Sequence, residues 1–303
     1  MYVYKLGILT NDIKKDFHAA ELLEKASSRA DIFAIQPKDL EFKICRNVPV
    51  IKAGNINAYG LNAVFVRHLD NRFDTELQFD LLKELQQAGI LLINSYNSLQ
   101  IVESKAMTSY LLALYGLPVI ECLVTQQAGN ALSFFADYGD VVVKPLYSNL
   151  GSDLFRLKDY KKPKRIIVDL IAKYGSIYLE RYINSGGKDK RVFVVDDHVV
   201  AAIERKAQRG FKTSLFQGGK AKNISLSKQL RDMAIKASQI LGLDYSGVDI
   251  ITEDGCSYIL ELNGSPSWAG VKEATGKDIA AEIVSATIKK LKKYNKTGQF
   301  ISS

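Results

Sequence analysis

The sequence predicts an α/β leading domain followed by a longer α+β region. Strand and helix signals alternate up to about residue 94, as they do in parallel βαβ units. Beyond residue 176, several strand-like runs instead follow one another closely. The pattern changes after Asn94-Ser95, and a domain boundary is therefore expected near residue 95.

The leading domain, residues 1–95, is expected to be a small βαβ-type unit with a mainly parallel sheet. Amphipathic patterns predict two helices that separate runs of strand-forming residues. The predicted helices cover residues 17–28 and 75–88, and the predicted strands cover 5–10, 31–36, 61–66 and 90–93.

A central domain, residues 96–175, is expected to begin with a helix over 105–115. Ser104 is a typical N-cap for this helix, which should end at Gly116, two residues before Pro118. Strands over 140–144 and 154–157, joined by a turn, and a basic helix that ends near residue 173 complete the unit.

The last region, residues 176–303, combines closely spaced strands with two helices. A long helix over 227–241 and a final helix over 278–293 are predicted from their apolar periodicity. The predicted strands cover 177–182, 191–195, 199–204, 245–252 and 257–263.

The composition is that of a globular protein, with 47% apolar and 24% charged residues in 303. No apolar run approaches the roughly 20 residues that a membrane-spanning helix needs. The first ten residues lack the basic and small-residue features of a signal peptide. Cys45, Cys122 and Cys256 form no CxxC pair, which favours reduced thiols and a cytoplasmic location.

The net charge of +8 is unevenly distributed along the chain. Residues 1–94 hold twelve basic and twelve acidic side chains, so the whole excess follows residue 94. Residues 180–222 contain ten basic and five acidic side chains. A further group lies at the end of the chain and is expected to be a solvated surface: Lys289, Lys290, Lys292, Lys293 and Lys296.

The run from Asp244 to Pro266 is the most informative part of the sequence. Asp254-Gly255 between two β-rich runs predicts a hairpin, which places Asp249 opposite residues 259–261. Strand alternation puts Glu261 and Asn263 on one face. Two carboxylates and an amide oxygen suit Mg²⁺ better than zinc or copper. An ordinary hairpin with a polar outer face remains the alternative interpretation.

Two further segments offer cations. Lys144 ends an apolar strand before a small polar turn, which could place its ammonium group and backbone N–H groups around phosphates. Arg191 and Arg205 lie inside strand-like runs, where they could clamp phosphate or carboxylate bidentately. A solvent-exposed lysine on a plain hairpin, and a solvated basic face, are the respective alternatives.

Taken together, these segments resemble the RimK-like branch of the ATP-grasp ligases, which includes α-L-glutamate ligases. The similarity extends from about residue 93 to 293, and the joint spacing of its motifs is more specific than any one of them. The motifs include Ile93-Asn94-Ser95, Ser104-Lys105, Gly116-Leu117-Pro118, the run from Val199 to Ala207, Gly218-Gly219, Ala234 to Ala237, Gly247-Val248-Asp249, Glu261 to Pro266 and Thr275 to Ala280.

The resemblance implies an ATP-grasp fold, in which two subdomains hold a nucleotide between β-sheets, and it implies roles for individual residues. Asp249, Glu261 and Asn263 match the Mg²⁺ ligands. Arg191 and Arg205 match the catalytic basic pair near the γ-phosphate and the acyl group. The residues that match nucleotide-binding positions are Lys105, Lys144, Glu180, Arg181, Tyr182, Ile183, Asp189, Lys212 and Ser214.

The implied activity is ATP- and Mg²⁺-dependent amide formation, with two Mg²⁺ ions expected and Mn²⁺ as a substitute. Phosphorylation of a carboxylate gives an acylphosphate, from which an amino group expels phosphate. Such chemistry needs positioning and charge neutralisation more than histidine or cysteine. The expected substrates are L-glutamate and a carboxylate acceptor on a cofactor, peptide or protein, and a homo-oligomer is compatible with the sequence. Segments 147–153 and 207–217 are candidate lids.

Some residues depart from the family pattern. Ser148, Asn149 and Asp153 replace residues in a turn that is usually richer in glycine, and Lys212-Thr213-Ser214 replaces an Arg-x-Asn motif. Trp268 and Ala269 also differ from the usual sequence. A catalytically impaired nucleotide-binding protein is therefore the alternative to an active ligase. A nucleic-acid-binding module, which rests only on the net charge, is the less favoured third hypothesis.

Overall fold

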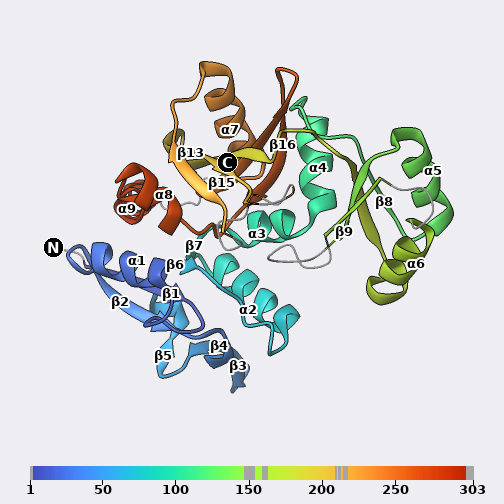
Figure 1. Ribbon diagram of the computed structural model, residues 1–303. Coiled ribbons are helices and arrows are strands. Elements are labelled where there is room, and N and C mark those ends of the chain that lie inside the picture. Colours follow the sequence, from blue (N-terminus) through green and yellow to red (C-terminus); the bar gives the residue numbers. More distant parts are fainter. Residues whose placement is uncertain are drawn as a thin grey trace.

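The computed structural model describes residues 3–146, 154–158, 163–208, 210, 213 and 218–297 of the chain, with side chains up to Tyr294. Figure 1 shows the leading sheet in blue and a small sheet beside green helices, each next to a larger central sheet. None of the helices in this described part has the length and apolar content needed to traverse a bilayer.

The leading sheet has the strand order β2 (Ala30–Ile35), β1 (Tyr4–Leu9), β6 (Ala63–Val66) and β7 (Leu91–Ile93), and all neighbours are parallel. Helices α1 (Phe17–Ser27) and α2 (Thr75–Gln87) belong to the same unit. The Asp16 carboxylate caps α1 by accepting the backbone N–H groups of His18 and Ala19. The predicted parallel βαβ unit is therefore confirmed, with element ends within two residues.

A second, antiparallel sheet was not predicted. It contains β3 (Leu40–Cys45), β4 (Val48–Ala53) and β5 (Ile56–Asn57), next to two short 3₁₀ helices at Pro37–Asp39 and Ala58–Gly60. The tight turn between β3 and β4 is formed by Arg46 and Asn47, both at positive φ. Because this turn has no glycine and most of β3 is exposed, neither a turn motif nor a burial pattern marks the hairpin.

Two consecutive helices connect the leading sheet to the rest of the chain. They are α3 (Tyr96–Glu103) and α4 (Lys105–Leu114). The Ser104 hydroxyl accepts the Met107 N–H at 3.3 Å, so the predicted cap is confirmed. Helix α3 was not predicted, although Ser95 caps it in the same way, through the Ser98 N–H at 3.1 Å.

The small sheet has the order β10 (Phe155–Leu157), β9 (Val141–Pro145), β11 (Ile177–Arg181) and β8 (Cys122–Thr125), and is antiparallel. Helices α5 (Ala128–Tyr138) and α6 (Pro163–Tyr174) pack on one face through Phe135 and Ile167. Strand β8 and helix α5 were not predicted. The opposite face carries Lys144, Tyr178 and Glu180, which alternate with core residues along β9 and β11.

The large sheet is antiparallel, with the order β14 (Lys220–Asn223), β13 (His198–Lys206), β12 (Lys188–Val195), β15 (Tyr245–Glu253) and β16 (Cys256–Asn263). Helix α7 (Lys228–Ile240) covers one face, against residues such as Val192, Val248 and Leu262. Asp249 lies opposite Glu261, so the predicted hairpin register is confirmed. Strand β14 and helix α8 (Ala269–Thr275) were not predicted, and α9 (Ile279–Thr297) ends the described chain.

The other face of the large sheet shares one core with the leading sheet. Leu6 and Phe65 of the leading sheet cluster with Phe193 and Tyr245 of the large sheet and with Trp268. The Trp268 indole is fully buried, and its Nε1–H donates to the Glu21 carboxylate at 2.6 Å. The departure from the family pattern at residue 268 therefore lies in this core.

Asn94 joins the two sheets by hydrogen bonds. Its side-chain amide donates to the carbonyl oxygens of Tyr245 at 2.9 Å and Gly264 at 2.5 Å. Its carbonyl oxygen accepts the N–H groups of Asp244 at 2.6 Å and Tyr245 at 3.1 Å. All the donors and acceptors of a fully buried side chain are thus used to hold the ends of β15 and β16.

We expect Asn94→Ala to lower the free energy of unfolding by about 3 kcal/mol or more, because it leaves several buried backbone groups without partners. Urea unfolding at pH 7 measures this change. Asn71→Ala, at an exposed turn position, is the matched control and should change stability by less than about 0.5 kcal/mol. Similar stabilities for the two variants would contradict the assigned role.

A pH dependence is expected from His18, whose ring packs edge-on against Trp268. Burial and the nearby Arg67 charge lower the pKa of His18 to about 4. The unfolded chain therefore binds a proton below about pH 6.5 that the folded chain takes up only near pH 4. Stability should fall as the pH drops through this interval, and urea unfolding of His18→Asn should show a flatter dependence than the wild-type protein. Equal slopes would refute the pKa shift.

Candidate functional site

Charged side chains occupy one half of the large-sheet face whose other half packs on the leading domain. Strand alternation explains the division: Phe193 lies in the core, and Asp189 and Arg191 precede it on the same face of β12. Tyr245 and Asp249 are related in the same way along β15. The structure thus brings six predicted residues to neighbouring positions on four strands: Asp189, Arg191, Arg205, Asp249, Glu261 and Asn263.

The Asp249 carboxylate lies at the centre of this face. Arg191 donates to both of its oxygens, with its Nη2 at 2.8 Å from Oδ2, and Arg205 Nη2 lies 2.8 Å from the same oxygen. Burial alone would raise the pKa of Asp249, but the two guanidinium groups outweigh it and hold the pKa below its usual value. Asp249 is therefore a buried carboxylate that remains ionised.

Asp189 extends the network on the far side of Arg205. The Arg205 guanidinium binds the Asp189 carboxylate with two bonds of 2.8 and 2.6 Å, and the Thr213 hydroxyl donates to the same carboxylate at 2.5 Å. Although burial opposes the charge of Arg205, Asp249 and Asp189 together raise the pKa of Arg205. The predicted residues Lys212 and Ser214, which flank Thr213, lie outside the described residues.

Gly247 makes room for Arg191. A Cβ atom at residue 247 would lie 2.9 Å from Pro266 Cβ and 3.1 Å from both Cδ and Nη1 of Arg191. From the sequence, Gly247 was identified only as part of the motif Gly247-Val248-Asp249. Its position in a strand, two residues before Asp249, could have indicated that it makes room for another group, since a glycine within a strand often marks a place where a ligand or another part of the chain comes close.

Glu261 and Asn263 lie on β16 beside this network. The Glu261 side chain is exposed, and it forms no hydrogen bond or ion pair within the described residues. Glu103, at the end of α3, lies close enough to Glu261 that burial and this second carboxylate raise the pKa of Glu103. No sequence motif marks Glu103, which was not predicted to belong to the site.

These donors fit a hard divalent cation. In the described part of the chain, no three His, Cys, Asp or Glu side chains gather in a group that could hold a metal, so the predicted set needs the Asn263 amide oxygen as a third donor. Ionised Asp249 has lone pairs left beside its two arginine partners. An all-oxygen set of this kind matches the ligand preference of Mg²⁺.

The small sheet contributes a second charged group. Lys144 Nζ lies 2.9 Å from Glu180 Oε1 and 4.9 Å from the centre of the Tyr178 ring, and all three side chains are buried. The Tyr178 hydroxyl shares a hydrogen bond of 2.8 Å with Ser109 on α4. The predicted Lys144 is thus an inward-facing cation, and the alternative of a solvent-exposed lysine is wrong.

Lys105 connects the two charged groups. Burial lowers the pKa of Lys105, whereas the Glu261 carboxylate of the large sheet and Glu180 of the small sheet act in the opposite direction. Lys105 Nζ also lies 3.5 Å from the Leu146 carbonyl oxygen, just before the segment 147–153, which is outside the described residues. That segment holds Ser148, Asn149 and Asp153 and is the first of the two candidate lids. Most of segment 207–217, the second, is also outside.

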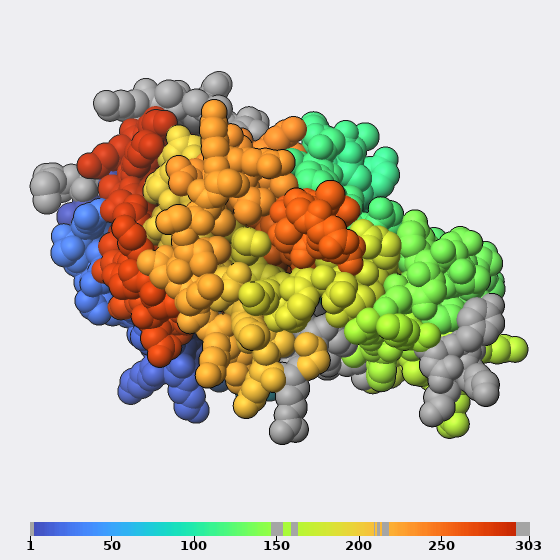
Figure 2. Space-filling model, turned by 45° about the horizontal axis from the view of Figure 1, so that its top comes forward, coloured from blue at the N-terminus to red at the C-terminus, as the bar shows by residue number. Residues whose placement is uncertain are grey.

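The other described residues that were predicted to bind nucleotide, Arg181, Tyr182 and Ile183, make different kinds of contact. Arg181 binds Glu121 at 2.8 Å and Glu253 at 2.6 Å, and Glu253 also accepts the Asn184 N–H at 2.6 Å. Arg181 therefore ties β11 to the tip of the β15–β16 hairpin, whose orange-red atoms lie against the yellow residues that follow β11 in Figure 2. The Arg156 Cζ atom lies 3.4 Å from the centre of the Tyr182 ring, and the Ile183 side chain is buried.

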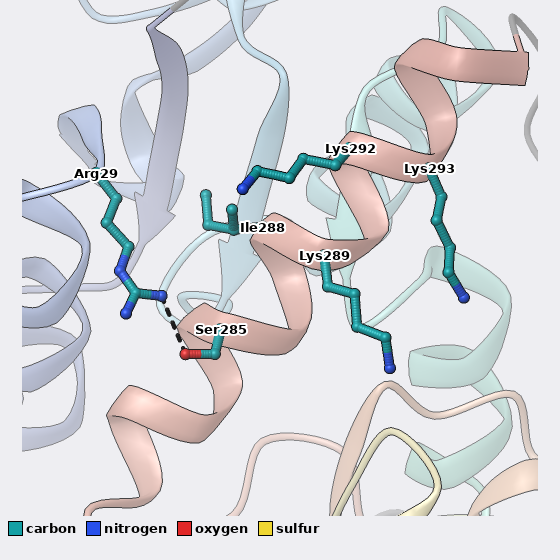
Figure 3. Close-up of a pocket in the computed structure, with 6 residues that line it drawn as sticks. All are labelled: Arg29, Ser285, Ile288, Lys289, Lys292 and Lys293. Carbon is teal, nitrogen blue, oxygen red and sulfur yellow. Dashed lines mark hydrogen bonds between the residues drawn. The ribbon is translucent and has the colours of Figure 1, made fainter.

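The lysines at the end of the chain belong to a different surface. A pocket of about 390 Å³ lies between Arg29 and α9 and is lined by Ser285, Ile288, Lys289, Lys292 and Lys293 (Figure 3). Lys289 pairs with Asp196 at 3.1 Å and Lys290 with Asp244 at 2.5 Å. The solvated surface predicted for these lysines thus includes ion pairs to the large sheet.

We expect Asp249→Asn to lower the free energy of unfolding by about 3 kcal/mol at pH 7, because the buried Arg205 and the partly buried Arg191 lose their ionised partner. The pKa of folded Asp249 is lowered, so this stabilisation is present above about pH 4 and is lost as the pH falls further. Urea unfolding at pH 7 and pH 3.5 should therefore show a smaller difference between variant and wild type at the lower pH. Glu261→Gln should be as stable as wild type, because the Glu261 carboxylate has no hydrogen-bond or ion-pair partner in the part of the chain that the structure describes.

Comparison with known proteins places these features in a family. A model described as the RimK-like ATP-grasp domain matches residues 83–287. The tetrahydromethanopterin:alpha-L-glutamate ligase of Methanosarcina acetivorans is 31% identical, over 90% of this chain and 95% of its own length. A probable alpha-L-glutamate ligase 2 of Hahella chejuensis is 30% identical, over 94% and 95%.

Solved structures share the fold. The ATP-grasp ligase PsnB, in a complex with a precursor variant, Mg and ADP, superposes with a TM-score of 0.73 at 21% identity and covers 95% of this chain and 99% of PsnB. The D-cycloserine synthetase DcsG gives a TM-score of 0.73 at 19% identity, with coverage of 95% and 99%. The chain belongs to the RimK-like ATP-grasp family of ATP-dependent ligases.

Proposed function

We propose that this protein joins L-glutamate to a carboxylate-bearing acceptor, through an acylphosphate formed with ATP and Mg²⁺. The observation that carries the proposal is the ionised, buried Asp249 between Arg191 and Arg205, beside Glu261 and Asn263. The names of the relatives, which are glutamate ligases over almost the whole chain, support the choice of amino acid.

In this proposal the two charged groups hold opposite ends of the triphosphate. Lys144 and Lys105 neutralise phosphate oxygens from the small-sheet side, and residues 180–183 hold the base. Arg191 and Arg205 stabilise the charge on the γ-phosphate and on the acceptor carboxylate. A planar guanidinium suits this task, because its fork matches carboxylate and phosphate oxygens.

Asp249, Glu261 and Asn263 would hold Mg²⁺, which neutralises charge on the transferring phosphoryl group when it is bound. Asp249 also fixes the orientation of both arginines, and Asp189 fixes Arg205 from the other side. Because each arginine is held before substrate binds, less reorganisation is needed during the reaction. Two ions, and replacement by Mn²⁺, remain part of the proposal.

The alternative of a nucleotide-binding protein without ligase activity is less well supported. It was motivated by residues 148, 149, 153, 212 and 214, which lie outside the described residues. The charged face of the large sheet carries Asp189, Arg191, Arg205, Asp249 and Glu261, as the proposed chemistry requires. A nucleic-acid partner has no specific observation in its favour.

The purified protein should release ADP only when ATP, Mg²⁺, L-glutamate and a suitable acceptor are all present. A panel of carboxylate acceptors, with amide products identified by mass spectrometry, measures this dependence. Hydroxylamine should trap the acylphosphate as a hydroxamate. ATP binding without ADP release or hydroxamate formation across the panel would favour the inactive alternative.

Glu261→Gln tests the metal ligands without disturbing the arginine network. Loss of one ligand should lower the rate of ADP release about 100-fold or more, since the cation contributes several kcal/mol to charge stabilisation. Glu273→Gln, at an exposed position of α8, is the matched control and should retain wild-type activity. Full activity in Glu261→Gln would remove Glu261 from the site.

A further inference from the structure

Arg67 lies at the point of the leading sheet where a ligand is most expected. It directly follows β6, and Thr10 directly follows the neighbouring β1. The strand order β2-β1-β6-β7 reverses direction between β1 and β6. In open parallel sheets, ligands bind at the carboxyl ends of the strands where the order reverses. No sequence motif marks Arg67.

The Arg67 guanidinium is buried, and no anionic group of the described residues is hydrogen-bonded to it. The residue is 2% exposed, and among the described residues its Nη1 donates only to hydroxyl oxygens, of Tyr245 at 3.2 Å and Ser265 at 3.0 Å, while its Cζ lies 4.8 Å from the centre of the Trp268 ring. Its Nε is buried and has no hydrogen-bond partner in the described structure. A buried charge without a bonded counter-ion is costly, so the site is suited to an anion supplied from outside.

The acidic groups nearby are used for other contacts. Asp16 is close enough that the Arg67 charge helps to lower its pKa against the effect of burial. However, the Asp16 oxygens accept from the Thr10 hydroxyl at 2.8 Å and from the N-terminal N–H groups of α1, and lie 3.4 Å from His68. Glu21 is bound to Trp268 and Lys272.

The same sheet face leads from Arg67 to the reacting groups. Tyr245, which bonds Arg67, is followed on this face by Gly247 and Asp249. Pro266, next to the other partner Ser265, lies against Gly247, as does Arg191. Four residues of strand span about 13 Å. This exceeds the separation of the two carboxylates of glutamate, which are three carbon atoms apart.

We propose that Arg67 binds a second carboxylate of the acceptor, one that does not react. The reacting carboxylate would lie near Arg191, and the second would accept the free Nε–H of Arg67 about one dipeptide away. The inference rests on the proposed function, because it assumes that the acceptor is activated at the charged face. It defines the acceptor class as an elongated compound with at least two acidic groups.

Two peptides that differ in one charge test this assignment. N-acetyl-L-glutamyl-L-glutamate carries a remote acid on its first residue, whereas N-acetyl-L-glutaminyl-L-glutamate has an amide there. The second peptide keeps only the two carboxylates of its terminal glutamate, which are too close together to reach both Arg191 and Arg67. Calorimetric titration in the presence of AMP-PNP and Mg²⁺ should show about tenfold tighter binding of the first peptide to the wild-type protein, as expected for one charged hydrogen bond. In Arg67→Met this ratio should fall to about one, and in Arg67→Lys it should be intermediate.

Arg72→Met is the matched control, because Arg72 follows in the same loop but pairs with Asp70 at an exposed position. Arg72→Met should keep the wild-type ratio of affinities for the two peptides. All variants should bind AMP-PNP as tightly as the wild-type protein, which shows that they are folded. Equal binding of the two peptides to the wild-type protein, or an unchanged ratio in Arg67→Met, would overturn the proposal even if one variant folds poorly. Weaker binding of free L-glutamate to Arg67→Met would assign the site to the amino acid instead, which also overturns it. The calorimetry requires no turnover, so these outcomes are independent of the ligase assay.

Discussion

The ionised carboxylate of Asp249, enclosed by two arginines, is the interaction on which the rest of the site depends. Burial of charges on a sheet face is unfavourable unless each is paired, and four charges are paired here without a break, from Arg191 through Asp249 and Arg205 to Asp189. Adjacent antiparallel strands supply these residues in register. The network therefore fixes the side chains that the proposed chemistry needs before any substrate arrives.

The same sheet face also docks the leading domain. Phe193 and Tyr245 lie in the shared core, while Arg191 and Asp249 lie further along the same strands. Asn94, which follows β7 of the leading sheet, holds the start of β15 and the end of β16 through four hydrogen bonds. A shift of the leading domain would consequently move the strands that carry the charged network, because packed cores transmit displacement.

Much of this arrangement could be predicted from the sequence, because it follows from alternation and from a short turn. Asp254-Gly255 and the flanking β-rich runs set the register that places Asp249 opposite Glu261. The sequence could not show that Asp249 is enclosed by Arg191 and Arg205, since these residues are 58 and 44 positions away in the chain and meet Asp249 only through the order of β13, β12 and β15 in the sheet. Likewise, no motif marks Arg67, whose partners Tyr245 and Ser265 belong to the other end of the chain. Short elements such as β8 and β14 carry too few residues for a reliable periodic pattern.

The structure explains where the basic side chains of the chain lie and which of them are paired. The leading domain is neutral in total, yet it contributes Arg67, a buried cation, to the boundary with the large sheet. The basic excess of the later region is partly neutralised within the protein, since Arg191, Arg205 and Lys144 are paired with Asp249, Asp189 and Glu180. Cations held in this way are oriented by their partners and shielded from solvent ions, so they can act on a bound anion more strongly than lysines on an open surface. The number of buried and oriented cations, more than the net charge of +8, therefore determines which anions the protein can recognise.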